Sequence, residues 1–69
     1  MLDRECKRLA KRMLKLMSEQ GISQAELARR SGQTPMQVSR VVTAQQMPSA
    51  LSLFKMARVL DCEISELLG

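Results

Sequence analysis

The sequence predicts an all-α fold, a compact domain of five helices. Its 69 residues suffice for one small domain over residues 1–69, with a core near the lower size limit for independent folding. Phe54 is the single aromatic residue, so Leu, Ile, Val, Ala and six Met must fill the core. That composition suits close-packed short helices better than a β-sandwich, which draws on β-branched and aromatic side chains.

The first predicted helix covers residues 2–20. Its apolar residues recur with the three-and-four spacing of one helix face. They are Leu2, Cys6, Leu9, Met13 and Leu16, with Ala10, Leu14 and Met17 widening the stripe. Gly21 ends the helix, because glycine takes the left-handed conformation at low cost. A basic helix lying on a membrane surface is the rival interpretation, but the amphipathic segments that follow need this apolar face as a partner.

The second predicted helix is short and has its own start and stop signals. Ser23 and Glu26 form a capping box, in which each side chain accepts a hydrogen bond from the other's backbone N–H. Leu27 and Ala28 face inward, and Gly32 stops the helix after two turns. The small Ala28 lets the next helix approach closely.

A third helix begins almost at once. Thr34 and Gln37 repeat the capping box, and Pro35 takes the first helical position, where its missing N–H costs nothing. Val38 belongs to the inward face. Two capped helices joined by a turn of about three residues form a helix-turn-helix, here over about residues 24–42.

The last third of the chain predicts a loop and two more helices. Residues 43–48 form the loop, and Ser49 then caps a helix over 50–60. Asp61 breaks that helix, and the apolar ISELL segment at 64–68 makes one final short turn. No repeat, linker or low-complexity tract interrupts the domain.

Charge is unevenly distributed along the chain. The formal net charge is +4, and residues 27–60 contain five Lys and Arg but no Asp or Glu. An acid-free stretch with scattered cations is typical of a surface that meets a polyanion. A mildly basic, solvated protein is the alternative that charge alone leaves open.

The sequence indicates neither an enzyme nor a metal or cofactor site. It has no histidine for acid–base chemistry, no glycine-rich phosphate loop and no carboxylate pair within its acid-free centre. Without His, a zinc site would need two Cys and two carboxylates, an uncommon ligand set, so Cys6 and Cys62 are interpreted as small buried residues in a reducing cytoplasm. No apolar run approaches the roughly 18 residues of a membrane span, so we expect a soluble protein.

Two stretches carry a family resemblance, SQAELARRSGQTPMQVSRVV and PSALSLFKMARVLDCEISELL. With them the chain resembles the lambda-repressor-like, Cro and Xre-type helix-turn-helix family from Met13 to its C-terminus. The resemblance implies a five-helix DNA-binding domain whose recognition helix, residues 34–42, enters the major groove. It further implies a small transcriptional regulator of double-stranded operator DNA, a homodimeric repressor of phage, plasmid or autoregulatory type.

The resemblance also implies which residues meet the bases. Met36 and Arg40 fall on base-facing positions, and Gln37 lies beside them. Arg40 has two donors for guanine O6 and N7, Gln37 has the groups to pair with adenine, and Met36 can pack on a thymine methyl. The alternatives are a Gln37 that only closes its capping box, and ordinary surface roles for Met36 and Arg40.

Backbone contacts are implied for polar residues around the helix-turn-helix. Neutral donors of this kind fix the register on DNA without reading its sequence. The six residues are Gln24, Thr34, Ser39, Thr43, Gln45 and Gln46.

The chain departs from the family pattern in three places. Met17 and Val42 stand where the family usually has an Arg–Glu ion pair, and an apolar contact is expected instead. Ala44 replaces a helix-ending glycine, so the third helix is expected to run longer or to end less sharply. Gln45 and Gln46 replace cations in the loop, which would shift the phosphate grip to Arg29, Arg30 and the basic first helix.

The partners remain a choice between three possibilities. The favoured one is operator DNA bound by a homodimer, with the C-terminal residues Ile64, Leu67 and Leu68 at the interface. A protein-interaction module such as an antitoxin or inhibitor is the second, and exposed Leu14, Val42 and Met47 would favour it. The third is a non-specific nucleic-acid or membrane-surface binder driven by the first helix.

Overall fold

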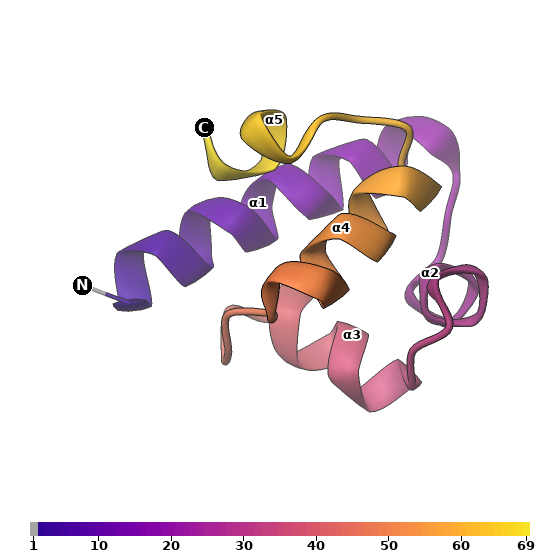
Figure 1. The fold of residues 1–69 in the computed structure, drawn as a ribbon, viewed down its shortest axis with the longest axis horizontal. Helices are drawn as coiled ribbons and strands as arrows, with labels where there is room; N and C mark the ends of the chain where they lie inside the picture. The colour runs from indigo at the N-terminus through magenta and orange to yellow at the C-terminus, as the bar shows by residue number, and fades with distance from the viewer. Residues whose placement is uncertain (1) are drawn as a thin grey trace.

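A computed structural model describes residues 2–69, with side chains from Arg4 onward. The described chain consists of five α-helices without a strand: α1 (Leu2–Gln20), α2 (Gln24–Ser31), α3 (Pro35–Val42), α4 (Ala50–Val59) and α5 (Ile64–Leu68) (Figure 1). The predicted all-α class and the five helices are therefore confirmed. Met1 lies outside the described residues, as does the side chain of Leu2, the first member of the predicted apolar stripe.

The long helix α1 runs along one side of the fold (Figure 1). It packs against α3 and against α5, while α4 packs against α2 and α5. Its predicted stripe is buried at Leu9, Met13 and Met17, but Leu14 is 44% exposed. Residue 14 lies one step around the helix from Met13 and Met17, so Leu14 widens the stripe at its solvent edge.

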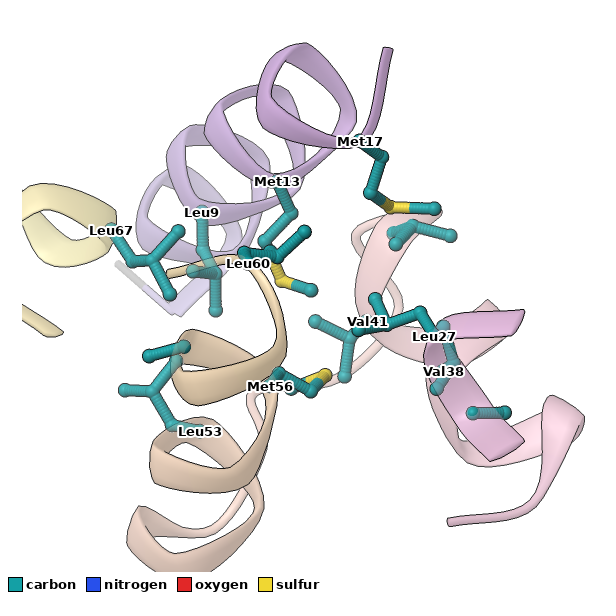
Figure 2. Packing of buried hydrophobic residues seen from close by; sticks show 13 residues of the cluster. Leu9, Met13, Met17, Leu27, Val38, Val41, Leu53, Met56, Leu60 and Leu67 are labelled. Atoms are coloured by element: carbon teal, nitrogen blue, oxygen red, sulfur yellow. The ribbon is translucent and has the colours of Figure 1, made fainter. Parts of the chain in front are cut away.

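The core draws apolar side chains from all five helices (Figure 2). The most deeply buried of them come from elements far apart in sequence. They are Leu9, Met13, Leu27, Val38, Met56, Leu60 and Leu67. Methionine and branched aliphatic residues thus fill the space between short helices, as the lack of aromatic residues requires.

Four helix ends share one backbone arrangement. After α1, α2, α3 and α4, a residue takes the left-handed conformation, and the next N–H bonds a carbonyl five residues back. The left-handed residues are Gly21, Gly32, Ala44 and Asp61, with φ of 67°, 71°, 61° and 55°. Gly and Asp at these positions were predicted to end their helices, and they do.

Ala44 corrects the expectation for the third helix. Helix α3 ends at Val42, as sharply as the helices that end at glycine. The Gln45 N–H donates to Arg40 O at 2.8 Å, which closes the same motif. Ala44 therefore adopts the conformation that glycine would adopt, at a cost of about 1–2 kcal/mol for a residue with a Cβ.

Three side chains close the fold from a distance. Arg12 of α1 donates to Glu66 O at 2.9 Å, and Arg8 donates to Gly69 O at 3.4 Å. Gln20 donates to Leu60 O at 2.6 Å, at the end of α4. The two arginine bonds fix the last turn of the chain onto α1, and the Gln20 bond fixes the end of α4 there. Carbonyls at a helix end have no intrahelical donor, so side chains can satisfy them.

Candidate nucleic-acid interface

Helix α2 is capped by half of the predicted box. The Glu26 N–H donates to Ser23 Oγ at 3.1 Å, as expected. The reciprocal bond is replaced, since the Glu26 carboxylate lies 3.8 Å from Arg29 and 3.6 Å from Arg30. Gly32 then reverses the chain, and the Gln33 N–H donates to Ala28 O at 2.8 Å. The turn between α2 and α3 is thus closed by backbone hydrogen bonds.

The start of α3 carries the complete capping box. The Gln37 N–H donates to Thr34 Oγ1 at 3.2 Å, and the Thr34 N–H donates to Gln37 Oε1 at 2.9 Å. Pro35 occupies the first turn. The side-chain oxygen of Gln37 is therefore occupied, while its NH2 group is left for another acceptor.

The three predicted base-contacting residues lie together on the open face of α3. Met36 is 62% exposed, and Gln37 and Arg40 are exposed as well. Arg40 Nη2 lies 3.3 Å from Met36 Sδ, one turn back on the same helix. The opposite face is buried through Val38 and Val41, so α3 presents one apolar and one uncommitted polar face.

The predicted backbone-contacting residues flank this face. Gln24 is exposed at the first residue of α2, and Thr34 is exposed at the cap of α3. Ser39 is half-buried, and its carbonyl accepts from Thr43 Oγ1 at 2.6 Å. Gln45 and Gln46 are exposed in the loop, and their N–H groups donate to Arg40 O at 2.8 and 3.2 Å.

Sequence reasoning missed a polar network that anchors the turn. Buried Ser31 donates to Leu27 O at 2.7 Å and accepts from Gln33 Nε2 at 3.0 Å. The Ser52 hydroxyl of α4 in turn donates to Gln33 Oε1. The network ties the turn between α2 and α3 to α4 and fixes the angle at which α3 is presented. A serine on the inward face of α2 was the available signal.

Comparison with known protein families identifies the family of this chain. A profile described as helix-turn-helix matches residues 9–67, and the predicted resemblance is confirmed. The chain belongs to the lambda-repressor-like, Xre-type helix-turn-helix family. As a member of this family, the protein is a DNA-binding domain of the kind used in transcription regulation.

A solved structure is similar over nearly the whole chain. It is the restriction-modification controller protein C.AhdI from Aeromonas hydrophila, 31% identical in sequence. The alignment covers 93% of this chain and 97% of that one, with a TM-score of 0.88. No curated protein matches the chain.

The departure at Met17 and Val42 replaces the family's ion pair by apolar burial. Met17 and Val42 are each only 4% exposed and belong to the same core cluster. Val42 is therefore not available to a partner, and Met47 is half-buried against the core. Of the three residues expected to mark a protein-binding surface, Leu14 alone is exposed.

Two arginines of the first helix, which was expected to share the phosphate grip, bond the C-terminal end of the chain. Arg12 donates to Glu66 O in α5, and Arg8 donates to Gly69 O. Arg29 and Arg30 remain exposed on α2. Among the described residues, no cluster of His, Cys, Asp or Glu has the geometry to hold a metal ion. No helix of the described chain has the length and apolarity of a membrane span.

Proposed function

We propose that this protein binds a specific double-stranded DNA operator as a homodimer and represses transcription, with α3 in the major groove. The observation that carries the proposal is the open face of α3, where Met36, Gln37 and Arg40 are exposed beside one another. A helix fits the major groove of B-DNA, and its first turns meet the base edges there.

Arg40 is the residue proposed to read a base directly. Its guanidinium contacts only Met36 Sδ among the described residues, so its paired donors are free for guanine O6 and N7. A bidentate contact of this type discriminates against a wrong base by about 1–3 kcal/mol. Met36 supports the guanidinium stem and is itself placed to pack on a thymine methyl.

Gln37 has a narrower role than the sequence implied. Its oxygen accepts from the Thr34 N–H, whereas recognition of adenine needs that oxygen for the N6 amino group. The capping box engages one of the two lone pairs of this oxygen and fixes its direction, whereas the NH2 group of Gln37 has no partner among the described residues. We therefore assign it a donor role, toward an acceptor such as a purine N7 or a thymine O4.

The register on DNA is assigned to neutral donors at both ends of the motif. Gln24 lies at the N-terminus of α2, where free N–H groups and the helix dipole favour an anion. Thr34 is the N-cap residue of α3, and Gln45 and Gln46 lie beyond the other end of that helix. Ser39 and Thr43 are weaker candidates, since the first is half-buried and the hydroxyl of the second already donates to Ser39 O.

The homodimer is proposed to form through exposed apolar residues of α4 and α5. Leu67 is fully buried in its own core, so it cannot serve the interface as expected from sequence, and Ile64 is half-buried against that core. Leu68 is 48% exposed, and Leu51 and Phe54 of α4 are 62% and 46% exposed. The molecule measures 29 × 22 × 20 Å, a size that allows two copies to place their α3 helices about 34 Å apart, one DNA turn.

The similar protein C.AhdI is a restriction-modification controller protein. We propose that this protein acts as a small autoregulatory regulator of transcription. Such a regulator acts in the compartment that holds the DNA, which for a bacterial or phage protein is the cytoplasm.

In vitro selection from a random duplex library tests the proposal, with sedimentation of the protein–DNA complex as a second readout. We expect enrichment of a palindrome with half-sites about one helical turn apart and two chains per duplex. Enrichment of no motif, with binding that fades uniformly as salt rises, would refute sequence-specific recognition. The fold would then be serving a protein partner, as in an antitoxin or inhibitor.

A further inference from the structure

An open hollow of about 500 Å³ lies between α2 and α4. Its lining is made by the end of α2 and by the second half of α4. The lining residues are Arg30, Ser31, Gly32, Lys55, Arg58 and Val59. Three of the six are cations and none is acidic, so the hollow concentrates positive charge on one flank of the domain.

The hollow is separate from the proposed reading face. None of the nine residues assigned to base or backbone contacts lines it, and Arg30 is the one lining residue that was also expected to grip DNA phosphates. Helix α4 packs against α2 and α5, whereas α3 packs against α1 and α2 (Figure 1). The positive charge of the hollow therefore has no part in base recognition by α3.

Helix capping does not account for these cations. Basic residues in a last turn commonly complement the partial negative charge of a helix C-terminus. Here the last carbonyls already have donors, because Ala28 O accepts from the Gln33 N–H at 2.8 Å and Ala57 O accepts from the Cys62 N–H at 3.0 Å. The basic side chains of the hollow make no hydrogen bond to these carbonyls.

Neutralisation by acidic neighbours is also incomplete. Glu26 is shared between Arg29, at 3.8 Å, and Arg30, at 3.6 Å. One exposed carboxylate between two guanidinium groups leaves a net positive charge, and exposed pairs of this length are weak.

The two cations of α4 are positioned without an acidic partner. The Arg58 guanidinium carbon lies 5.8 Å from the centroid of the Phe54 ring, a cation–π contact that holds this group at the surface of α4. Lys55 is exposed and forms no ion pair with any described residue. Both charges are thus presented at the hollow and are available to an anion.

We propose that this hollow binds phosphate groups, from a di- or polyphosphate or from the backbone of a nucleic acid. Two guanidinium groups present planar donor forks that match phosphate oxygens, and the Lys55 ammonium adds a third charge. The concave shape suits a compact, multiply charged oxyanion. The proposal does not depend on operator recognition by α3.

Inorganic pyrophosphate is the first probe, titrated into the full chain at low salt and followed by backbone amide NMR. We expect saturable shifts confined to residues 30–32 and 55–59. The Lys55→Gln/Arg58→Gln variant should weaken binding at least fivefold. The matched control Lys11→Gln/Lys15→Gln removes two exposed charges from α1 and should weaken it less than twofold. An equal loss in both variants, or shifts spread over α1, would overturn the site.

A second arm identifies the source of the phosphate. Each phosphate that a protein neutralises on B-DNA contributes about −0.9 to the slope of log K against log salt. If the hollow holds backbone phosphates, Lys55→Gln/Arg58→Gln lowers the magnitude of that slope by about 1–2 on a long duplex. If the ligand is a free phosphate compound, the slope stays unchanged. Because the pyrophosphate titration contains no DNA, its failure would leave the proposed operator binding untouched.

Discussion

Arginines in two regions of this molecule have different tasks. On α1, Arg8 and Arg12 reach carbonyls of the C-terminal turn, 61 and 54 residues away in sequence. On α3, Arg40 contacts only Met36, four residues away. The first region uses its cations to close the fold, whereas the second leaves its cation free for a ligand. Stability and recognition should therefore respond to different substitutions.

The largest effect on stability is expected in the closed region. Leu67→Ala removes a fully buried side chain from the core, and large-to-small changes at such sites cost about 2–5 kcal/mol. Leu68→Ala, one residue on, alters a side chain that is 48% exposed and should leave the stability of the monomer within about 0.5 kcal/mol.

Chemical denaturation of both variants, with sedimentation to measure dimerisation, checks this contrast. Leu68→Ala should weaken the dimer while Leu67→Ala weakens the fold. If Leu68→Ala destabilised the monomer as strongly as Leu67→Ala, the assignment of Leu68 to a surface would be wrong.

The two left-handed helix ends of the helix-turn-helix provide the next contrast. Gly32→Ala meets no atom within 4 Å, so its cost is conformational, about 1–2 kcal/mol. Ala44→Gly removes the same penalty and loses about 0.4–1 kcal/mol to the greater freedom of glycine in the unfolded chain. A net gain of about 0.5 kcal/mol in the free energy of unfolding is expected.

Thermal and urea unfolding measure the change in the free energy of unfolding for each variant. A decrease for Gly32→Ala together with an increase for Ala44→Gly would show that Ala44 carries backbone strain. Destabilisation by Ala44→Gly would mean that the alanine methyl group makes a packing contribution larger than that strain.

Arg12→Ala tests the long-range closure directly. It deletes the bond to Glu66 O at 2.9 Å, and loss of a partly exposed hydrogen bond of this kind costs about 1 kcal/mol. Arg4→Ala removes an exposed arginine from the same helix and serves as the control. DNA affinity should fall equally in the two variants. A selective loss of DNA affinity in Arg12→Ala would place that residue in the interface instead.

The smallest effect concerns the thiol of Cys62. Burial, together with Glu66, Asp61 and Glu63, raises the pKa of Cys62 above its ordinary value of 9.0. The folded state thus holds the proton more tightly than the unfolded state. This contribution to stability is present below pH 9.0 and is lost as the pH rises through the folded pKa.

Alkylation at pH 8–9, resolved by site with mass spectrometry, measures this pKa. Cys62 should react more slowly in the native protein than in urea, beyond the effect of its partial exposure. A rate that increased with salt would confirm the acidic neighbours, because salt screens their charge. A native thiol that titrates at or below 9.0 would contradict the raised pKa.

Local signals in the sequence predicted most of the fold. Capping pairs, Pro35 and the glycines at 21 and 32 are short-range features, and each predicted helix matches the structure closely. The exposed cluster of Met36, Gln37 and Arg40 followed from the same local pattern, once the family resemblance had aligned it.

Local sequence signals did not predict the contacts between helices. Burial of Leu67 and Val42 depends on which helices they meet, and periodicity within one short helix cannot supply that information. The hydrogen bond from Ser52 to Gln33 joins residues 19 positions apart in the sequence. The hydrogen bond from Arg12 to Glu66 O in α5 joins residues 54 positions apart. The sequence pattern does not distinguish a polar side chain that bonds a backbone carbonyl from one that is free to bind a ligand.

The most direct test of the central claim is the affinity of Arg40→Ala for a selected operator and for every single-base-pair variant of its half-site. Arg4→Ala is the matched control. The wild type and the control should discriminate at one guanine position by about 1–3 kcal/mol, and Arg40→Ala should lose discrimination at that position alone. The free energy of unfolding of Arg40→Ala should equal that of the wild type. A uniform loss of affinity across all sequences, equal to that of the control, would contradict base reading by α3.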